Sequence, residues 1–191
     1  MEEIADEIRA CVRCPLGETR IMAVPGEGAM TSGLMLVGEA PGKNEDESGR
    51  PFCGAAGKNL DLGLEAAGLT REDVFVTSIN KCRPPKNRDP KREEKEACQP
   101  WLDAQVEALR PKALVALGRH GLSGLVEDAP KKFGDVRGQF VEGKNGVPVF
   151  CMLHPAAIIY RQAWRETYLA DWGRLGAWVR TGVLPLDVSD S

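Results

Sequence analysis

The sequence predicts an α/β protein in which helices cover both faces of a parallel β-sheet. Four short apolar runs are spaced along the 191 residues, at 34–37, 74–79, 113–117 and 147–153. Segments with helical character lie between most of these runs. Strands that alternate with helices form parallel sheets with right-handed crossovers. A chain of this length is sufficient for one domain with a full core, and we expect a single domain over 1–191.

Three segments have the pattern of helices. Residues 55–68 end in Gly68, which favours a helix C-terminus. Residues 90–110 begin at Pro90 after Asp89, a pair typical of the N-cap and first helical positions. In residues 162–180 large apolar side chains recur near helical spacing, and we interpret this stripe as core. Its members are Trp164, Tyr168, Trp172, Leu175 and Trp178.

The segments that follow the four apolar runs are chemically unusual. They read GEAPG, NKCRPP, GRHG and HPAAIIYR, and residues 137–150 before the last have the pattern of a hairpin with an Asn145-Gly146 turn. In an open parallel sheet the carboxyl ends of the strands meet at one edge, where ligands bind. The sequence therefore predicts one crevice that gathers these residues.

The first of these segments is not a phosphate-binding loop. A Walker A motif needs GxxxxGK followed by Ser or Thr. The spacing from Gly38 to Lys43 is wrong, and Asn44 replaces the hydroxyl residue. The stretch GEAPGKNEDESGRPFCG is instead acidic and glycine-rich, and it ends next to an isolated aromatic residue, Phe52.

Charge and hydropathy restrict the class of protein. The apolar runs are far shorter than the ~20 residues that span a bilayer, and the acidic N-terminus lacks the pattern of a signal peptide. We therefore expect a cytoplasmic protein without a membrane partner.

The formal net charge is −3, yet residues 81–95 carry seven basic and three acidic side chains. This run is either a solvated face, which charge alone favours, or a patch that contacts phosphates.

The six cysteines suggest metal ligands or core residues more than disulfides. Cys11 and Cys14 form a C-x2-C pair, and Cys82 and Cys98 flank the basic run. Four such thiolates hold either a zinc ion or an iron–sulfur cluster, and the spacing leaves both open.

The two remaining cysteines and the two histidines have simpler interpretations. We interpret Cys151 as a core residue of a strand and Cys53 as a small buried filler. His120, at a predicted helix start, receives a structural interpretation. His154 ends a strand at the predicted edge, where a neutral imidazole can donate a hydrogen bond to a developing oxyanion.

Five motifs, taken together, resemble the type-4 uracil-DNA glycosylases, the iron–sulfur members of their superfamily. They are GEAPGKNED, GRPFCGAAG, KCRPPKNRDP, CQPWL and HPAA, in family order over about residues 8–175. The resemblance implies a three-layer α/β/α fold with a four-stranded parallel central sheet. It also implies a [4Fe-4S] cluster held by Cys11, Cys14, Cys82 and Cys98. The implied activity is excision of uracil from DNA by hydrolysis of the N-glycosidic bond.

The resemblance also implies roles for single residues. Phe52 would stack on the flipped base, His154 would stabilise charge on uracil O2, and Glu45, with Glu39 second, would support the cationic sugar. The residues expected to contact the base are Glu39, Ala40, Phe52, Ser78, Asn80 and His154. Those expected to contact phosphates are Lys81, Arg83, Lys86, Arg88, Arg161 and Arg165. Ile158 is expected to fill the gap that the flipped base leaves.

One position departs from the family pattern. The family usually has Asn four residues before the third cysteine, and here Ser78 stands there, with Asn80 two residues on. A hydroxyl cannot match the paired donor and acceptor of an amide. Two alternatives follow: a glycosylase with a shifted lesion range, such as hypoxanthine, and a non-catalytic iron–sulfur protein that binds DNA. The extra loop of the covalent uracil-trapping branch is absent from the sequence, so covalent capture is not expected. We expect a monomer whose partner is uracil-containing DNA, with a sliding clamp as a candidate recruiter.

Overall fold

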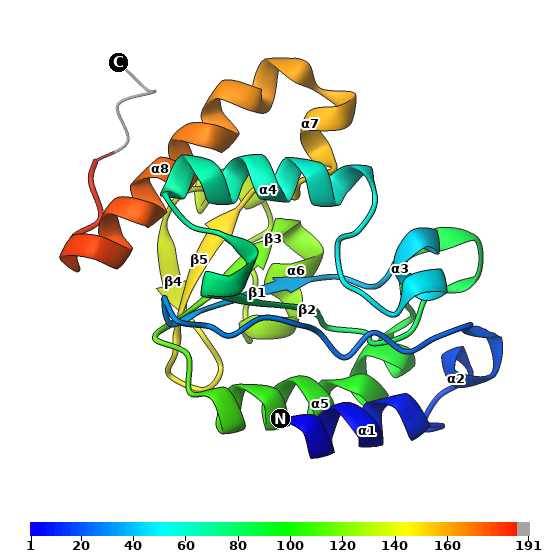
Figure 1. Cartoon of the computed structure of the whole chain (residues 1–191). Helices are drawn as coiled ribbons and strands as arrows, with labels where there is room; N and C mark the ends of the chain where they lie inside the picture. The colour runs from blue at the N-terminus through cyan, green and yellow to red at the C-terminus, as the bar shows by residue number, and fades with distance from the viewer. Residues whose placement is uncertain (187–191) are drawn as a thin grey trace.

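The central sheet lies between two layers of helices in the computed structural model, which describes residues 1–186 (Figure 1). The strand order is β2-β1-β3-β5-β4, and the first four of these strands are parallel. Their bounds are β1 (Leu34–Gly38), β2 (Val74–Ser78), β3 (Ala113–Leu117), β4 (Phe140–Glu142) and β5 (Pro148–Met152). The predicted parallel sheet is confirmed.

The predicted total of four strands is wrong, because the first arm of the hairpin joins the sheet. The short strand β4 pairs antiparallel with β5, and Phe140 lies opposite Phe150. Gly146 in the connecting turn has a φ of +70°, as the predicted Asn-Gly turn requires. Strand β4 is only partly buried, so its sequence lacks the continuous apolar run that marks the other strands.

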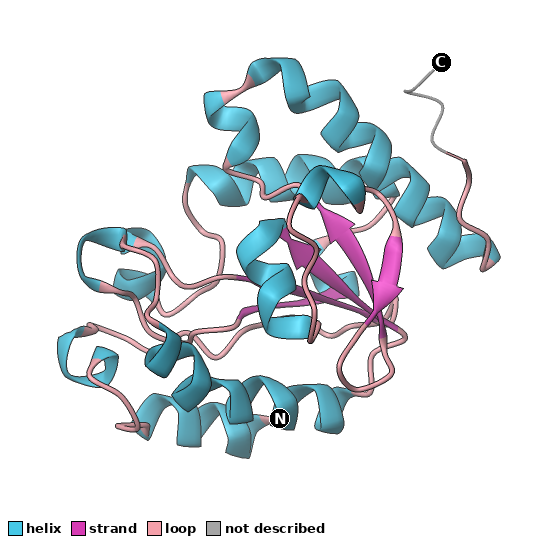
Figure 2. Ribbon diagram, turned by 180° about the vertical axis from the view of Figure 1, so that it is seen from behind, coloured by secondary structure: helices cyan, strands magenta, loops and turns pink. Residues whose placement is uncertain are grey.

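Helices cover both faces of the sheet (Figure 2). The helices are α1 (Glu2–Ala10), α2 (Leu16–Thr19), α3 (Lys43–Ser48), α4 (Ala55–Ala67), α5 (Arg92–Leu109), α6 (Gly118–Leu125), α7 (Ala157–Tyr160) and α8 (Arg165–Thr181). Short 3-10 turns occupy Arg71–Asp73, Pro85–Asn87, Phe133–Asp135 and Gln162–Trp164. No helix of residues 1–186 is long and apolar enough to cross a membrane.

The predicted helices are confirmed with two changes at their starts. Helix α4 ends at Ala67 and is capped by Gly68, which has a φ of 72°. Helix α5 starts at Arg92, and the predicted cap at Asp89 is wrong because the Lys91 N–H donates to Glu94 Oε2 over 2.7 Å. The segment 162–180 starts as a 3-10 turn before it becomes α8.

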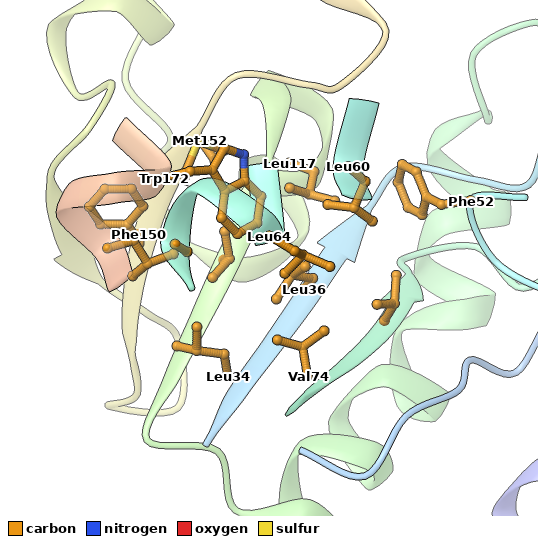
Figure 3. Close-up of a cluster of buried hydrophobic side chains, with 14 of the residues drawn as sticks. Leu34, Leu36, Phe52, Leu60, Leu64, Val74, Leu117, Phe150, Met152 and Trp172 are labelled. Carbon is orange, nitrogen blue, oxygen red and sulfur yellow. The ribbon is translucent and has the colours of Figure 1, made fainter. Parts of the chain in front are cut away.

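The parallel strands divide their side chains between two apolar layers. Leu34 and Leu36 of β1 face a cluster that includes residues of α4 and α8, whereas Met35 and Val37 face a cluster with residues of α5 and α6. Figure 3 shows the first cluster. Successive residues of a strand point to opposite faces, so a strand that is covered on both sides is apolar throughout.

The aromatic stripe of α8 belongs to the first cluster, as predicted for most of its members. Tyr168, Trp172 and Leu175 are fully buried. Trp178 is partly buried against them. The prediction is wrong for Trp164, which is 37% exposed because it belongs to the 3-10 turn before the helix.

Helices α4 and α8 approach so closely that a glycine is needed at position 176 of α8. A Cβ atom on Gly176 would lie 2.2 Å from the carbonyl oxygen of Ala67. A Cβ atom on Gly173, one turn earlier in α8, would lie 3.8 Å from the nearest heavy atom outside its own helix, the oxygen of Ala66.

These two glycines give a matched test of the helix packing. Gly176→Ala is expected to lower the free energy of unfolding by about 1–3 kcal/mol, because a backbone atom must move to admit the methyl group. Gly173→Ala is expected to be neutral or to stabilise by about 0.5–1 kcal/mol, since alanine favours helix. Urea unfolding followed by circular dichroism measures both. Equal effects would contradict the close packing at Gly176.

Candidate active site and cysteine centre

One pocket of about 440 Å³ lies at the carboxyl ends of β1, β2 and β5. It brings together six of the residues predicted to contact the substrate or to catalyse: Glu39, Ala40, Glu45, Phe52, Ser78 and His154. The other lining residues are Val24, Pro41, Gly42, Pro51, Ala56, Pro84, Asn87, Arg88, Ala156, Ile159 and Tyr160. The segments that follow the strands therefore meet at one edge, as the sequence predicts.

Phe52 belongs both to this pocket and to the apolar core. Its side chain is only 8% exposed, and its ring centroid lies 5.8 Å from that of His154. Gly38, at the end of β1, makes room for the ring, because a Cβ atom there would lie 2.8 Å from Phe52 Cζ. Phe52 has a φ of +50°, an uncommon backbone conformation for a bulky residue. Such strain persists only where surrounding contacts hold it.

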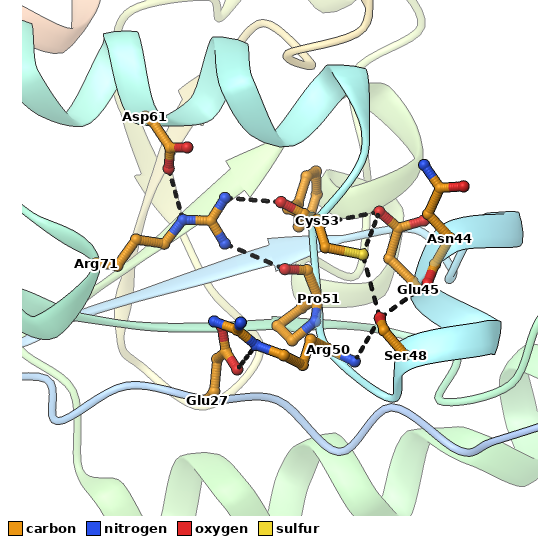
Figure 4. Close-up of polar contacts among 10 residues, drawn as sticks. Glu27, Asn44, Glu45, Ser48, Arg50, Pro51, Cys53, Asp61 and Arg71 are labelled. Carbon is orange, nitrogen blue, oxygen red and sulfur yellow. Dashed lines mark hydrogen bonds and ion pairs between the residues drawn. The ribbon is translucent and has the colours of Figure 1, made fainter.

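Arg71 holds this strained turn from outside the pocket (Figure 4). Its guanidinium donates to the carbonyl oxygen of Pro51 over 3.1 Å and to that of Phe52 over 2.7 Å. Its Nε donates to Asp61 Oδ1 over 2.6 Å. Sequence reasoning missed Arg71, because it lies in the segment between α4 and β2, far along the chain from the turn that it holds.

Glu45 holds the same turn from the other side (Figure 4). Its Oε1 accepts hydrogen bonds from the N–H groups of Cys53 (3.0 Å) and Gly54 (3.1 Å), and its Oε2 accepts one from Gly42 (3.0 Å). Both oxygens of Glu45 are therefore engaged by backbone. The prediction that Cys53 is a buried filler is wrong, since its side chain is exposed beside Ser48 Oγ at 3.2 Å.

The carboxylate of Glu39 has a different environment. Its Oε1 is buried, and no residue of 1–186 donates a well-aligned hydrogen bond to it. Two side chains lie close to this oxygen: His120 Nδ1 at 3.0 Å and Lys95 Nζ at 3.5 Å. Glu39 thus lines the pocket without being engaged by backbone as Glu45 is.

The hydrogen bonds of His154 determine its tautomer. The N–H of Ala156 donates to His154 Nδ1 over 3.1 Å, so Nδ1 is the acceptor and the neutral ring carries its proton on Nε2. Burial lowers the pKa of His154 to about 4, and the charge of His120 contributes in the same direction. His154 is therefore a neutral hydrogen-bond donor at physiological pH.

The structure separates Ser78 from Asn80. Ser78 lines the pocket, whereas Asn80 is 1% exposed and does not. The Asn80 Nδ2 donates to the carbonyl oxygen of Glu94 over 2.9 Å. The structure gives no support for the prediction that Asn80 contacts the base, because its amide points into the protein toward α5.

Lys81 is an internal residue, so the prediction that it contacts phosphates is wrong. It is 1% exposed, and its ammonium donates to Thr77 Oγ1, to the Ser78 carbonyl oxygen and to Gln105 Oε1, each over 2.7 Å. Burial lowers the pKa of Lys81 to about 7.

Other charges of the basic run are engaged within the protein. Arg88 forms two hydrogen bonds with the buried carboxylate of Glu94, at 2.8 and 2.6 Å. The Nε of Arg83 donates to Asn87 Oδ1 over 2.7 Å. Lys86 is exposed, and it has a φ of 56°, in the left-handed region.

The loop after β5 exposes different residues from the one that sequence analysis selected. Ile158 is 2% exposed and belongs to the core, so the structure contradicts its assignment as the residue that fills the DNA stack. Ile159 and Tyr160 line the pocket and are 38% and 85% exposed. Arg161 and Arg165 are exposed nearby, and the guanidinium of Arg161 lies 4.3 Å from the ring centroid of Trp164.

A second cavity is lined by all four cysteines proposed as metal ligands, together with Ile8 and Trp101. Three N–H donors reach their sulfur atoms: Arg20 to Cys82 (3.0 Å), Trp101 Nε1 to Cys11 (3.2 Å) and the backbone N–H of Lys81 to Cys98 (3.3 Å). Burial raises the pKa of Cys98 to about 11, so metal binding there releases a proton. The donor set of four cysteines with N–H groups on the sulfurs fits a thiolate-bound metal or iron–sulfur cluster.

Cys151 differs from these four. It is fully buried in β5 and is a core residue, as predicted.

The fold and the pocket define a member of the uracil DNA glycosylase superfamily, whose family model matches residues 25–173. Within it, the chain belongs to the type-4 uracil-DNA glycosylases. It is 46% identical to the type-4 uracil-DNA glycosylase of Pyrobaculum aerophilum over 90% of each chain. It is 43% identical to that of Saccharolobus solfataricus, over 98% of this chain and 90% of the relative. A type-5 uracil-DNA glycosylase of Pyrobaculum aerophilum is 35% identical, over 71% of this chain and 66% of the relative.

The tautomer and pKa of His154 lead to a test by NMR. In a pH titration the ring of His154 is expected to stay neutral, with the proton on Nε2, until the pH approaches about 4. The ordinary pKa of a histidine side chain is 6.5. Between pH 6.5 and 4 the unfolded chain therefore binds more protons than the folded chain. Stability is therefore expected to fall as the pH falls through this window, and less steeply in His154→Asn. A ring that titrates near 6.5 would contradict this environment.

Proposed function

We propose that this protein excises uracil from DNA and leaves an abasic site. One observation carries the proposal: the flat ring of Phe52 and the Nε2–H donor of His154 belong to the same pocket, with their ring centroids 5.8 Å apart. A planar base with a carbonyl group can use both at once, through stacking and a hydrogen bond.

The target nucleotide must leave the duplex to reach this pocket. Flipping costs roughly a few kcal/mol, and stacking on an aromatic side chain returns ~1–3 kcal/mol per base. Arg71 and Glu45 fix the turn that carries Phe52, so the stacking surface is formed before the base arrives. A preformed site spends less of the binding energy on ordering.

His154 would act on the leaving base. When the bond between C1′ and N1 breaks, its electron pair moves to the uracil ring, and negative charge develops on O2. The neutral Nε2–H of His154 donates a hydrogen bond to this oxygen and does not need to transfer its proton. A fixed donor aimed at developing charge is the usual form of electrostatic catalysis.

Glu39 is the better candidate for the carboxylate beside the sugar. The sugar becomes an oxocarbenium-like cation, water adds at C1′ and loses its proton to bulk water, and the uracil anion takes up a proton from bulk water. Both oxygens of Glu45 accept backbone N–H groups, which leaves Glu39 to face the cation. The methyl side chain of Ala40 supplies no base, so stabilisation of charge carries most of the catalysis in this proposal.

The exposed cations near the pocket would bind the phosphates of the DNA. The exposed apolar side chains would enter the stack of bases. Lys86, Arg161 and Arg165 are exposed, and we assign them to phosphates. Ile159 and Tyr160, at the rim of the pocket, replace Ile158 as the side chains that enter the space left by the flipped base.

The proposal also includes a monomer that a sliding clamp recruits to DNA. Size-exclusion chromatography of the protein with and without a sliding clamp tests both parts.

The four cysteines would hold a [4Fe-4S] cluster. When bound, the cluster serves as a covalent brace between the N-terminal segment and the segment from Cys82 to Cys98. This second segment includes Lys86 and the pocket residue Arg88. The donors Arg20 and Trp101 would orient and polarise the cysteine sulfurs. The basic run is thereby fixed at the edge of the pocket.

Ser78 supports a second candidate, a glycosylase with a wider lesion range. Its hydroxyl stands in the pocket where an amide would read the uracil edge, and Asn80 cannot replace it because its amide binds the Glu94 carbonyl. A panel of oligonucleotides with hypoxanthine and other deaminated bases tests this candidate. Excision of these bases at rates close to that of uracil would support it, and Ser78→Asn should then narrow the range.

The activity is tested with a fluorescent oligonucleotide that contains one uracil, followed by hot alkali. Cleavage is expected with uracil in single strands, opposite guanine or opposite adenine. Phe52→Leu keeps most of the buried volume but loses the flat ring. It is therefore expected to slow excision by about 5- to 100-fold, while unfolding stability changes by less than about 1.5 kcal/mol. Absence of cleavage in all three contexts would overturn the proposed function.

The cluster is tested with two cysteine variants. The purified protein is expected to be brown and to contain about four iron atoms per chain. Cys98→Ala should lose the colour and the iron, whereas Cys151→Ala, a change at the buried core cysteine of β5, should keep both. A colourless protein that contains zinc would contradict the assignment.

A further inference from the structure

We propose that His120 is a positioning residue that holds the Glu39 carboxylate in place for catalysis. This inference rests on the proposed function, because it assigns the support of one side chain in the same site. His120 does not line the pocket itself. It lies behind Glu39, at the carboxyl end of β3.

The packing of α6 brings His120 to this place. Helix α6 follows β3 directly, and a Cβ atom on Gly121 would lie 2.5 Å from the carbonyl oxygen of Val37. The start of α6 is therefore pressed against the end of β1, two residues before Glu39. The GRHG segment thus supplies glycines for close approach and a histidine that reaches the neighbouring strand end.

The neighbours of His120 determine which nitrogen carries the proton. The guanidinium of Arg119 lies 3.3 Å from His120 Nε2. A guanidinium can only donate, and it lies closer to Nε2 than the carboxylate of Asp89, whose Oδ2 is 3.9 Å away, so we assign Nε2 as the acceptor and place the proton of the neutral ring on Nδ1. Nδ1 is the atom that lies 3.0 Å from Glu39 Oε1. The tautomer that Arg119 selects is therefore the one that can donate to the carboxylate.

Glu39 Oε1 needs this donor. The oxygen is buried, and a buried carboxylate oxygen without a donor is costly. His120 Nδ1 is the nearer of the two nitrogen atoms beside Oε1, at 3.0 Å, whereas Lys95 Nζ lies farther away, at 3.5 Å. With Oε1 held, the second oxygen of Glu39 is left for the pocket.

The two histidines of the chain thus have opposite tautomers and separate roles. His154 accepts from backbone at Nδ1 and presents Nε2–H to the base. His120 accepts from Arg119 at Nε2 and presents Nδ1–H to Glu39. One ring acts on the leaving group, and the other holds the carboxylate that faces the sugar.

Single-turnover excision of uracil by three variants tests the inference. His120→Ala should lower the rate about tenfold, with little change in DNA affinity, because Glu39 loses its support but the DNA-binding surface is unchanged. His120→Asn should recover most of the rate, since its amide nitrogen takes the place of Nδ1. His120→Gln should not recover it, because its amide nitrogen lies where Nε2 was. Ser123→Ala, on the same helix, is the control, because it removes only the hydrogen bond from Ser123 Oγ to the carbonyl oxygen of His120 and leaves the imidazole unchanged.

A double-mutant cycle separates positioning from general stability. In a Glu39→Gln background, His120→Ala should cause no further loss of rate, because the group it positions is already changed. A further tenfold loss of rate in the Glu39→Gln background would overturn the inference. So would a single His120→Ala variant that excises uracil at the rate of the unchanged protein.

Nitrogen NMR of His120 tests the contact without reference to activity. The ring is expected to carry its proton on Nδ1. A proton on Nε2 would overturn the inference even if uracil is excised. Absence of excision by the unchanged protein would overturn the proposed function, and the NMR result would still decide whether His120 donates to Glu39.

Discussion

Burial of the parallel strands on both faces is the constraint on which the rest of the structure depends. Strands β1 and β3 are apolar throughout, so polar chemistry is placed at the carboxyl ends of the strands and in the segments that follow them. Because the strands are parallel, these segments meet at one edge. The side chains of Glu39, Ser78 and His154 share a pocket for this reason, although more than a hundred residues separate the first from the last.

Within the pocket, the stacking surface depends on a strained backbone that is held from two sides. Phe52 has a left-handed conformation, with Arg71 bound to its carbonyl oxygen and Glu45 bound to the N–H of the next residue, Cys53. The acidic character of the loop after β1 therefore has two causes. Glu45 builds the loop, and Glu39 lines the pocket without being engaged by backbone N–H groups.

The basic run shows why a count of charges is a weak guide to a binding surface. Seven cations occur in residues 81–95, but Lys81 is buried, with its ammonium on the carbonyl oxygen of Ser78, and Arg88 is bound to the carboxylate of Glu94. The run forms part of the framework between the cysteine centre and the pocket. Fewer of its charges are left for phosphates than the sequence suggests.

The sequence alone was sufficient for the parallel sheet, the helix after Phe52, the family and the four clustered cysteines, because local patterns and motif spacing encode them. It predicted the hairpin that contains β4 but not that β4 joins the central sheet, because this partly exposed strand has no continuous apolar run. It could not reveal that Lys81 and Ile158 point inward, or that both carboxylate oxygens of Glu45 accept hydrogen bonds from backbone N–H groups. Nor could it reveal that Arg71 and His120 support the site. Side-chain direction and long-range contacts decide these features, and only the packed structure fixes them.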